Sequence, residues 1–130
     1  MSGYRDLIVW EKAKKLAVGI YRQTNEGKFA RDFGFRDQIR RAAVSISSNI
    51  AEGAERNTNK DSIRFFHIAK GSTAEVATQL EIACEIEYIT QEQCRCFLQE
   101  CDEISRMLGS LIKIRTNNPK PRTGDPEPRT

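Results

Sequence analysis

Four cysteines are the residues of this chain whose chemistry best suits a metal or a disulfide. Their spacing argues against a metal, and the cytoplasmic location that we expect argues against a disulfide. They are Cys84, Cys94, Cys96 and Cys101. No Cys-x-x-Cys pair is present and the chain has a single histidine, so the ligand spacing of a zinc site is missing. Cys94 and Cys101 lie seven residues apart on an apolar helical stripe, where thiols act as small hydrophobic side chains. We therefore expect Cys96 to be exposed, the other three to pack in the core, and no metal to bind.

Catalytic patterns are absent around the remaining nucleophiles and bases. His67 has Arg64 three residues before it, where a di-iron helical bundle requires a glutamate. Ser45, Ser47 and Ser48 fall inside a helical pattern, with no strand-to-helix elbow to expose a nucleophile. The chain also lacks a glycine-rich phosphate loop. We expect a protein that is not an enzyme and needs no cofactor.

The basic residues form short rows at helical spacing. One row shares a face of the first predicted helix, and two further pairs are each four residues apart. Rows of this kind can contact successive phosphates of a nucleic acid. Aromatic residues do not alternate with them, so stacking of bases is not expected. The candidate nucleic-acid-binding residues are Lys12, Lys15, Arg22, Arg36, Arg40, Lys60 and Arg64.

Charge is distributed unevenly along the chain. Residues 1–70 contain 14 Lys or Arg and 8 Asp or Glu, whereas residues 71–118 contain 4 and 8. Three interpretations are open: the two halves pair with each other, the basic half binds nucleic acid, or complementary faces join identical subunits.

Composition indicates one helical domain followed by a tail. The 130 residues carry a net charge of +3, with 38% hydrophobic and 30% charged residues. All four prolines follow residue 118, and a long proline-free stretch favours long helices. We assign residues 1–116 to one domain and residues 117–130 to a flexible tail. No apolar run approaches the ~20 residues that span a bilayer, and no signal peptide opens the chain, so we expect a cytoplasmic protein.

Apolar periodicity predicts four helices over residues 7–24, 35–55, 59–87 and from about 91 onward. The first carries a stripe that begins at Trp10, and residues 25–34 are expected to connect it to the second, with Phe29 and Phe33 packed beneath. Thr58 and Thr90 begin capping boxes for the third and fourth helices. Short connections between long helices imply an all-α, antiparallel up-down four-helix bundle.

The third predicted helix has two apolar edges, one containing Phe66 and Leu80 and the other containing Phe65, Val76 and Ile86. One small bundle is not expected to bury both edges, so the pattern predicts an oligomer.

Three segments resemble a known family: DLIVWEKAKKL at residues 6–16, QIRRAAVSISSNIAEGAER at 38–56 and FFHIAKGSTAEVATQLEIA at 65–83. Together they are similar to bacterial four-helix bundle proteins named for reading frames inside intervening sequences of 23S ribosomal RNA. The resemblance spans residues 4–114 and implies a homopentamer. The same superfamily includes the accessory variability proteins of diversity-generating retroelements, which are basic pentamers that associate with a reverse transcriptase and its template RNA.

The segments that carry the resemblance also place polar residues along one side of the second helix, facing the third. We interpret these residues as a buried polar network that fixes the register of the helices, in preference to a ligand site. They are Arg41, Ser45, Asn49, Glu52, Arg56, Ser72 and Glu75.

These observations lead us to expect an oligomeric, RNA-associated scaffold. Its expected partners are further copies of itself, RNA or an RNA/DNA hybrid, and a reverse transcriptase or another ribonucleoprotein enzyme, with no membrane. The alternative is a structural or interaction protein of a 23S rRNA intervening sequence that has no direct role with nucleic acid.

Overall fold

The computed structural model describes residues 3–117, and this part of the chain contains helices and no strand. A short 3-10 helix, η1 (Tyr4–Asp6), precedes α1 (Ile8–Gln23). The other helices are α2 (Gly27–Arg31), α3 (Phe33–Ala54), α4 (Asn59–Glu85) and α5 (Gln91–Asn117). Asn117, which we assigned to the tail, is the last residue of α5, and the rest of that tail lies outside the described residues.

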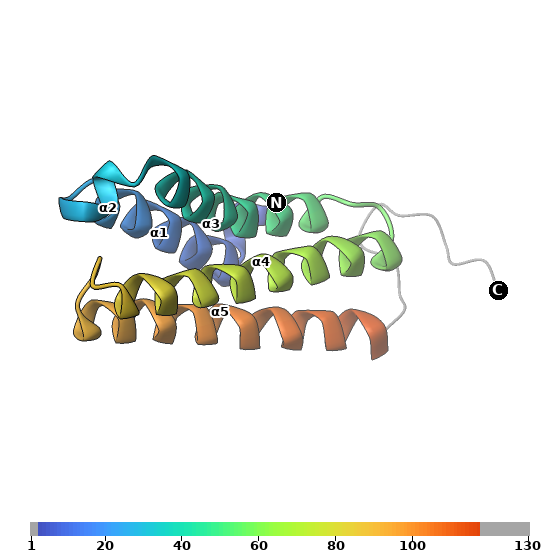
Figure 1. The fold of residues 1–130 in the computed structure, drawn as a ribbon. Helices are drawn as coiled ribbons and strands as arrows, with labels where there is room; N and C mark the ends of the chain where they lie inside the picture. The colour runs from blue at the N-terminus through green and yellow to red at the C-terminus, as the bar shows by residue number, and fades with distance from the viewer. Residues whose placement is uncertain (1–2, 118–130) are drawn as a thin grey trace.

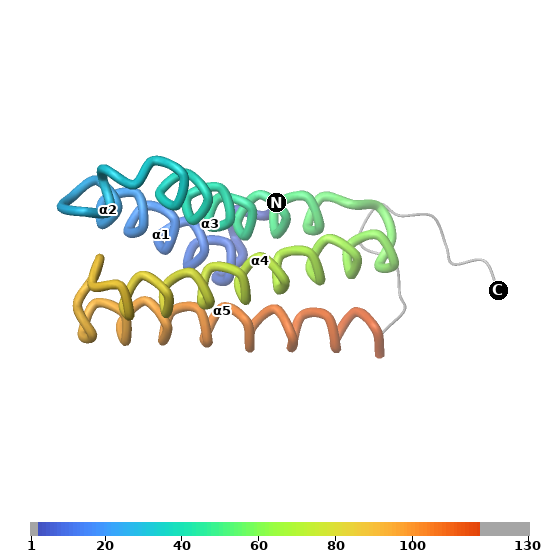
Figure 2. The backbone as a smooth tube through the Cα atoms, viewed as in Figure 1, coloured from blue at the N-terminus to red at the C-terminus, as the bar shows by residue number. Residues whose placement is uncertain are grey.

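The four long helices form an antiparallel bundle (Figure 1). α3 packs against α1 and α4, and α5 packs against α4 and α1, so the order around the bundle is α1, α3, α4, α5. Figure 2 shows that α2 and the α4–α5 turn lie at one end, which we call the α2 end, and that the α3–α4 turn lies at the other. None of the helices within residues 3–117 is long and apolar enough to cross a membrane.

The core follows the predicted stripes closely but not completely. On α1, Val9, Leu16 and Ile20 are buried, whereas Trp10 is only half-buried and packs edge-on against Tyr4. Near the α3–α4 turn, a Cβ on Gly53 would lie 2.6 Å from the ring of buried Phe66. A glycine is therefore required at this position for the two helices to meet.

The segment between the first two predicted helices is not a plain connection, because it contains α2 and the start of α3. Asp32 caps α3 by accepting a hydrogen bond from the Phe35 backbone N–H (3.2 Å) and also accepts one from the Tyr88 hydroxyl (2.8 Å). Phe29 is buried as expected, at 1% exposed, and its ring stacks on that of Phe35. The prediction for Phe33 is wrong: it is 63% exposed, since α3 begins at this residue and turns it outward.

Both apolar edges of α4 are largely buried inside this single bundle. Phe66 and Leu80 lie on one edge and Ala69 and Val76 on the other, and each is at most 2% exposed. α4 achieves this because it has α3 on one side and α5 on the other. The argument from two edges to a partner chain is therefore wrong, although Ile86, from the second edge, is 45% exposed.

Local sequence signals define where α4 begins and ends and where α5 begins. The Thr58 hydroxyl accepts from the Asp61 N–H, and Thr90 and Gln93 form a reciprocal capping box with bonds of 3.0 and 2.9 Å. α4 ends two residues earlier than predicted. Glu87 adopts a left-handed conformation (φ 64°), and the next N–H, that of Tyr88, donates to the Ala83 carbonyl (2.8 Å).

Candidate functional site

The candidate nucleic-acid-binding residues on α1 share one face of that helix. Lys12 forms an ion pair with Glu103 of α5, at 3.2 Å between Nζ and Oε1. Lys15 and Arg22 are exposed, and neither forms a hydrogen bond or ion pair with any other residue in the range 3–117. Of this row, Lys15 and Arg22 are thus fully available to an anion, whereas Lys12 is partly neutralised.

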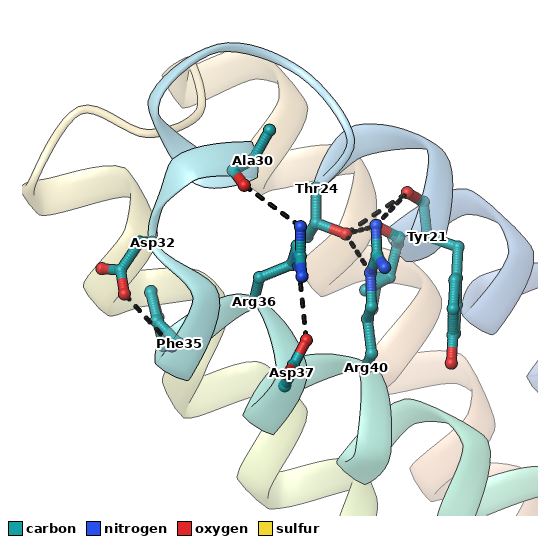
Figure 3. A network of polar contacts seen from close by, with 9 residues as sticks. Tyr21, Thr24, Ala30, Asp32, Phe35, Arg36, Asp37 and Arg40 are labelled. Atoms are coloured by element: carbon teal, nitrogen blue, oxygen red, sulfur yellow. Dashed lines mark hydrogen bonds and ion pairs between the residues drawn. The ribbon is translucent and has the colours of Figure 1, made fainter.

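Arg36 and Arg40 are engaged within the chain, as Figure 3 shows. Arg40 donates from Nε to the Thr24 hydroxyl (2.8 Å) and from Nη2 to the Tyr21 carbonyl (3.2 Å), and its guanidinium lies 4.5 Å from the Tyr21 ring centroid. Arg36 donates to the Ala30 carbonyl (3.1 Å). The two side chains are half-buried and tie the C-terminal ends of α1 and α2 to α3. They do not project freely as the four-residue spacing led us to expect.

Lys60 and Arg64 lie in the first turns of α4, at the end of the bundle opposite Arg36 and Arg40. Both are exposed, and the guanidinium of Arg64 lies 4.5 Å from the ring centroid of Phe65. Arg56 approaches the same ring at 4.6 Å. The seven candidate cations therefore occupy three separate places and do not form one continuous row.

Two exposed cations that we did not select, Lys28 and Arg31, lie on α2 near the end of α1. Residues 25–34 were expected to be an irregular connection. These two cations therefore could not be assigned to a helical face from their spacing. Residues 12–41 as a whole contain nine Lys or Arg and three Asp or Glu. α1, α2 and the first half of α3 thus form a basic layer along one side of the bundle.

An acidic layer lies beside the basic one. Residues 71–105, in the second half of α4 and the first half of α5, contain eight Asp or Glu and only one cation, Arg95. Burial raises the pKa of Glu100, and the neighbouring Glu103 carboxylate raises it further, while Lys12 acts in the opposite direction. Phosphate is repelled by such a surface, so an RNA contact is disfavoured on the acidic layer.

The predicted polar network lies along α3 and α4, and three of its residues, Arg41, Ser45 and Glu75, line a hollow between the two helices. The hydroxyls of Ser45 and Ser72 are 2.9 Å apart, and Asn49 Nδ2 donates to Ser45 Oγ at 3.0 Å. Glu52 and Arg56, which are four residues apart, form a separate ion pair with each other. Arg41 and Glu75 are exposed, and no hydrogen bond or ion pair joins either of them to another residue within 3–117.

The predicted network is therefore divided into a bonded Ser45–Asn49–Ser72 cluster, a separate Glu52–Arg56 pair and two uncommitted charges. The two uncommitted charges, Arg41 and Glu75, line a hollow of about 470 Å³. Its other lining residues are Gly34, Gln38, Ala42 and Ser45.

One buried polar atom of α4 was not predicted from the sequence. Gln79 is 5% exposed, and its side-chain carbonyl oxygen has no hydrogen-bond partner in the described part of the chain. It lies seven residues after Ser72, hence on the side of α4 that faces α3. The one sequence signal for this residue is its helical spacing, which places a polar side chain on the buried stripe of α4.

The cysteines lie where their spacing indicated. Cys94 and Cys101 are buried, Cys84 is half-buried and Cys96 is exposed. Burial raises the pKa of the Cys101 thiol to about 12, which keeps it protonated and unreactive at neutral pH. Residues 3–117 contain no group of three or more Cys, His, Asp or Glu arranged to hold a metal ion.

Comparison with known proteins gives one family and a solved structure. The family model described as 23S rRNA-intervening sequence protein matches residues 5–110. This chain belongs to that family. All three sequence segments that carried the resemblance lie inside the matched range.

Among solved structures, a protein of unknown function from the S23 ribosomal protein family of Bacteroides thetaiotaomicron is similar to this chain. The two are 31% identical with a TM-score of 0.76, over 82% of this chain and 99% of the other. A comparison with curated proteins gives no match. Membership of the 23S rRNA-intervening sequence protein family therefore agrees with the helical fold. The Bacteroides relative is of unknown function and so indicates no activity.

Proposed function

We propose that this chain is a non-enzymatic, oligomeric scaffold that associates with RNA. The observation that carries the proposal is the basic layer of α1, α2 and the first half of α3. In it the side chains of Lys15, Arg22, Lys28 and Arg31 are exposed and uncommitted within residues 3–117. Side chains of this type bind the phosphate backbone without reading sequence. RNA, or an RNA/DNA hybrid formed during complementary-DNA synthesis, is the ligand that we expect.

The resemblance to retroelement accessory proteins supports a further part of the proposal. We expect five copies around an axis, which would repeat each basic layer and so multiply a modest charge of +3 per chain. The expected protein partner is a reverse transcriptase or another enzyme that works on the bound RNA. In this arrangement the scaffold holds the RNA and the partner performs the chemistry.

Copurification tests this function. Tagged wild-type protein should retain RNA and a polymerase from its own cells, identified by sequencing and mass spectrometry. The Lys15→Glu/Arg22→Glu variant should lose most of the RNA, because both substitutions reverse charges that have no structural partner in the described chain. The control, Glu81→Gln/Glu85→Gln, removes two exposed acidic charges from α4 and should retain at least as much RNA.

The second candidate function is an interaction protein without a nucleic-acid role, and the acidic layer of residues 71–105 favours it. In that case the two Glu substitutions, and not the Lys15 and Arg22 substitutions, would change the proteins that copurify. Recovery of protein partners without RNA would move the assignment to this alternative.

A further inference from the structure

The thiols of Cys84 and Cys94 meet beside the turn that joins α4 to α5. Cys84 lies in the last turn of α4 and Cys94 in the first turn of α5. Cys94 Sγ donates to the Leu80 carbonyl oxygen at 3.6 Å, and Leu80 is one helical turn before Cys84. Burial raises the pKa of the Cys94 thiol, and a hydrogen bond with the Cys84 thiol raises it further. The two sulfur atoms are therefore neighbours in the reduced chain.

Helix geometry excludes the other cysteines as partners of this pair. Cys101 follows Cys94 by seven residues on α5, so their Cα atoms are about 10 Å apart along the axis, beyond the ~7 Å that a disulfide spans. Cys96, two residues after Cys94, points to a different side of α5 and is exposed. Within residues 3–117, Cys84 and Cys94 are thus the cysteines that the fold brings together.

The two thiols differ in their access to solvent. Cys84 is half-buried and lines a hollow of about 650 Å³ beside the α4–α5 turn, so a small oxidant can reach its sulfur. Cys94 is buried, and its raised pKa keeps it protonated at neutral pH. An accessible sulfur beside a sheltered second thiol is the arrangement of a reversible redox pair.

We propose that Cys84 and Cys94 are a redox modification site, at which a peroxide joins them by a disulfide that fastens α4 to α5. The Cys84 thiolate attacks one peroxide oxygen, the O–O bond breaks, and the other oxygen leaves as water after taking a proton. The Cys94 sulfur then attacks the sulfenic acid on Cys84, loses its proton and displaces the remaining oxygen as a second water. Two thiols lose two electrons, and one peroxide is reduced. A dithiol reductant reverses the bond by exchange.

Peptide mapping of the full chain tests the site independently of any RNA role. After reduction and treatment with hydrogen peroxide, the free thiols should fall from four per chain to two. Trypsin cleaves after Lys70 and Arg95 and so releases a peptide that contains this pair and neither of the other cysteines. Cleavage after Tyr88 divides that peptide between the two cysteines, and the parts should stay joined until dithiothreitol is added.

Urea unfolding provides a second readout. A bond between residues 84 and 94 closes a short loop in the unfolded chain, so oxidation should raise the folding equilibrium constant by up to about a hundredfold. Cys84→Ser should lose both the joined peptides and this rise. The matched control, Cys96→Ser, removes the exposed thiol of α5 and should keep both, and circular dichroism should show helical chains in each.

Three results would overturn the inference. The first is a wild-type peptide that separates after cleavage at Tyr88 without reductant. The second is an equal gain in stability on oxidation of Cys84→Ser, and the third is loss of that gain in Cys96→Ser alone. The wild-type peptide map decides the matter even where Cys84→Ser is less stable than the wild type.

Discussion

At the scale of single residues, the cations of this chain divide into those that bind the chain itself and those that do not. Arg40 shows the first kind, because its guanidinium donates to Tyr21 on α1 and to Thr24, which caps that helix. Arg22, which is on the exposed face of α1, shows the second kind. Both belong to the same predicted set, so substituting them separately tests whether structural and RNA-binding roles are distinct.

Arg40→Ala should lower the free energy of unfolding by about 1–2 kcal/mol, since it removes a charged donor from the buried Thr24 hydroxyl. Its effect on RNA affinity should be less than about twofold. Arg22→Ala should change the free energy of unfolding by no more than about 0.5 kcal/mol, and it should weaken RNA binding. Urea unfolding and RNA titration measure the two effects, and weaker RNA binding in folded Arg40→Ala would contradict this division.

At the scale of elements, the C-terminal end of α4 is held by an unusual residue choice. Glu87 occupies the left-handed position that glycine normally fills at the end of a helix. A side chain in this conformation destabilises the folded state by roughly 1–2 kcal/mol relative to glycine. The greater conformational freedom of glycine in the unfolded chain offsets part of this difference. The turn between α4 and α5 is therefore strained at one defined residue.

Glu87→Gly should raise the free energy of unfolding by about 0.5–1 kcal/mol. The matched control is Glu81→Gly, which removes the same charge from an exposed site inside α4 and should lower stability by about 1 kcal/mol. Chemical denaturation of both variants checks the pair. Destabilisation of equal size in both would show that the conformation of residue 87 has no energetic role.

The long helices could be predicted because their signals are local: apolar periodicity, the cap at Thr58 and the capping box at Thr90. The start of α3 was missed because Gly27 and Gly34 indicated a loop, whereas the cap at Asp32 also depends on Tyr88, 56 residues away. The intramolecular contacts of Arg40 could not be predicted for the same reason. Residue spacing places Arg40 on one face of a helix. Its hydrogen-bond partner, Thr24, comes within reach only because α1 packs against α3.

At the scale of the whole molecule, two layers of opposite charge lie side by side on the bundle. The basic layer of residues 12–41 lies beside the acidic layer of residues 71–105. The proposed RNA contact therefore belongs to the basic layer, and substitutions in the acidic layer should leave it intact.

The salt dependence of RNA binding tests the central claim most directly. For wild-type protein, the logarithm of the association constant should fall linearly with the logarithm of salt concentration, by about 0.7 per phosphate contact on single strands and about 0.9 on duplexes. Lys15→Glu/Arg22→Glu should reduce the slope by about 1.4–1.8 per chain that contacts the RNA, whereas Glu81→Gln/Glu85→Gln should leave it unchanged. Binding that is absent or insensitive to salt, or an equal slope in Lys15→Glu/Arg22→Glu, would contradict the proposed RNA scaffold.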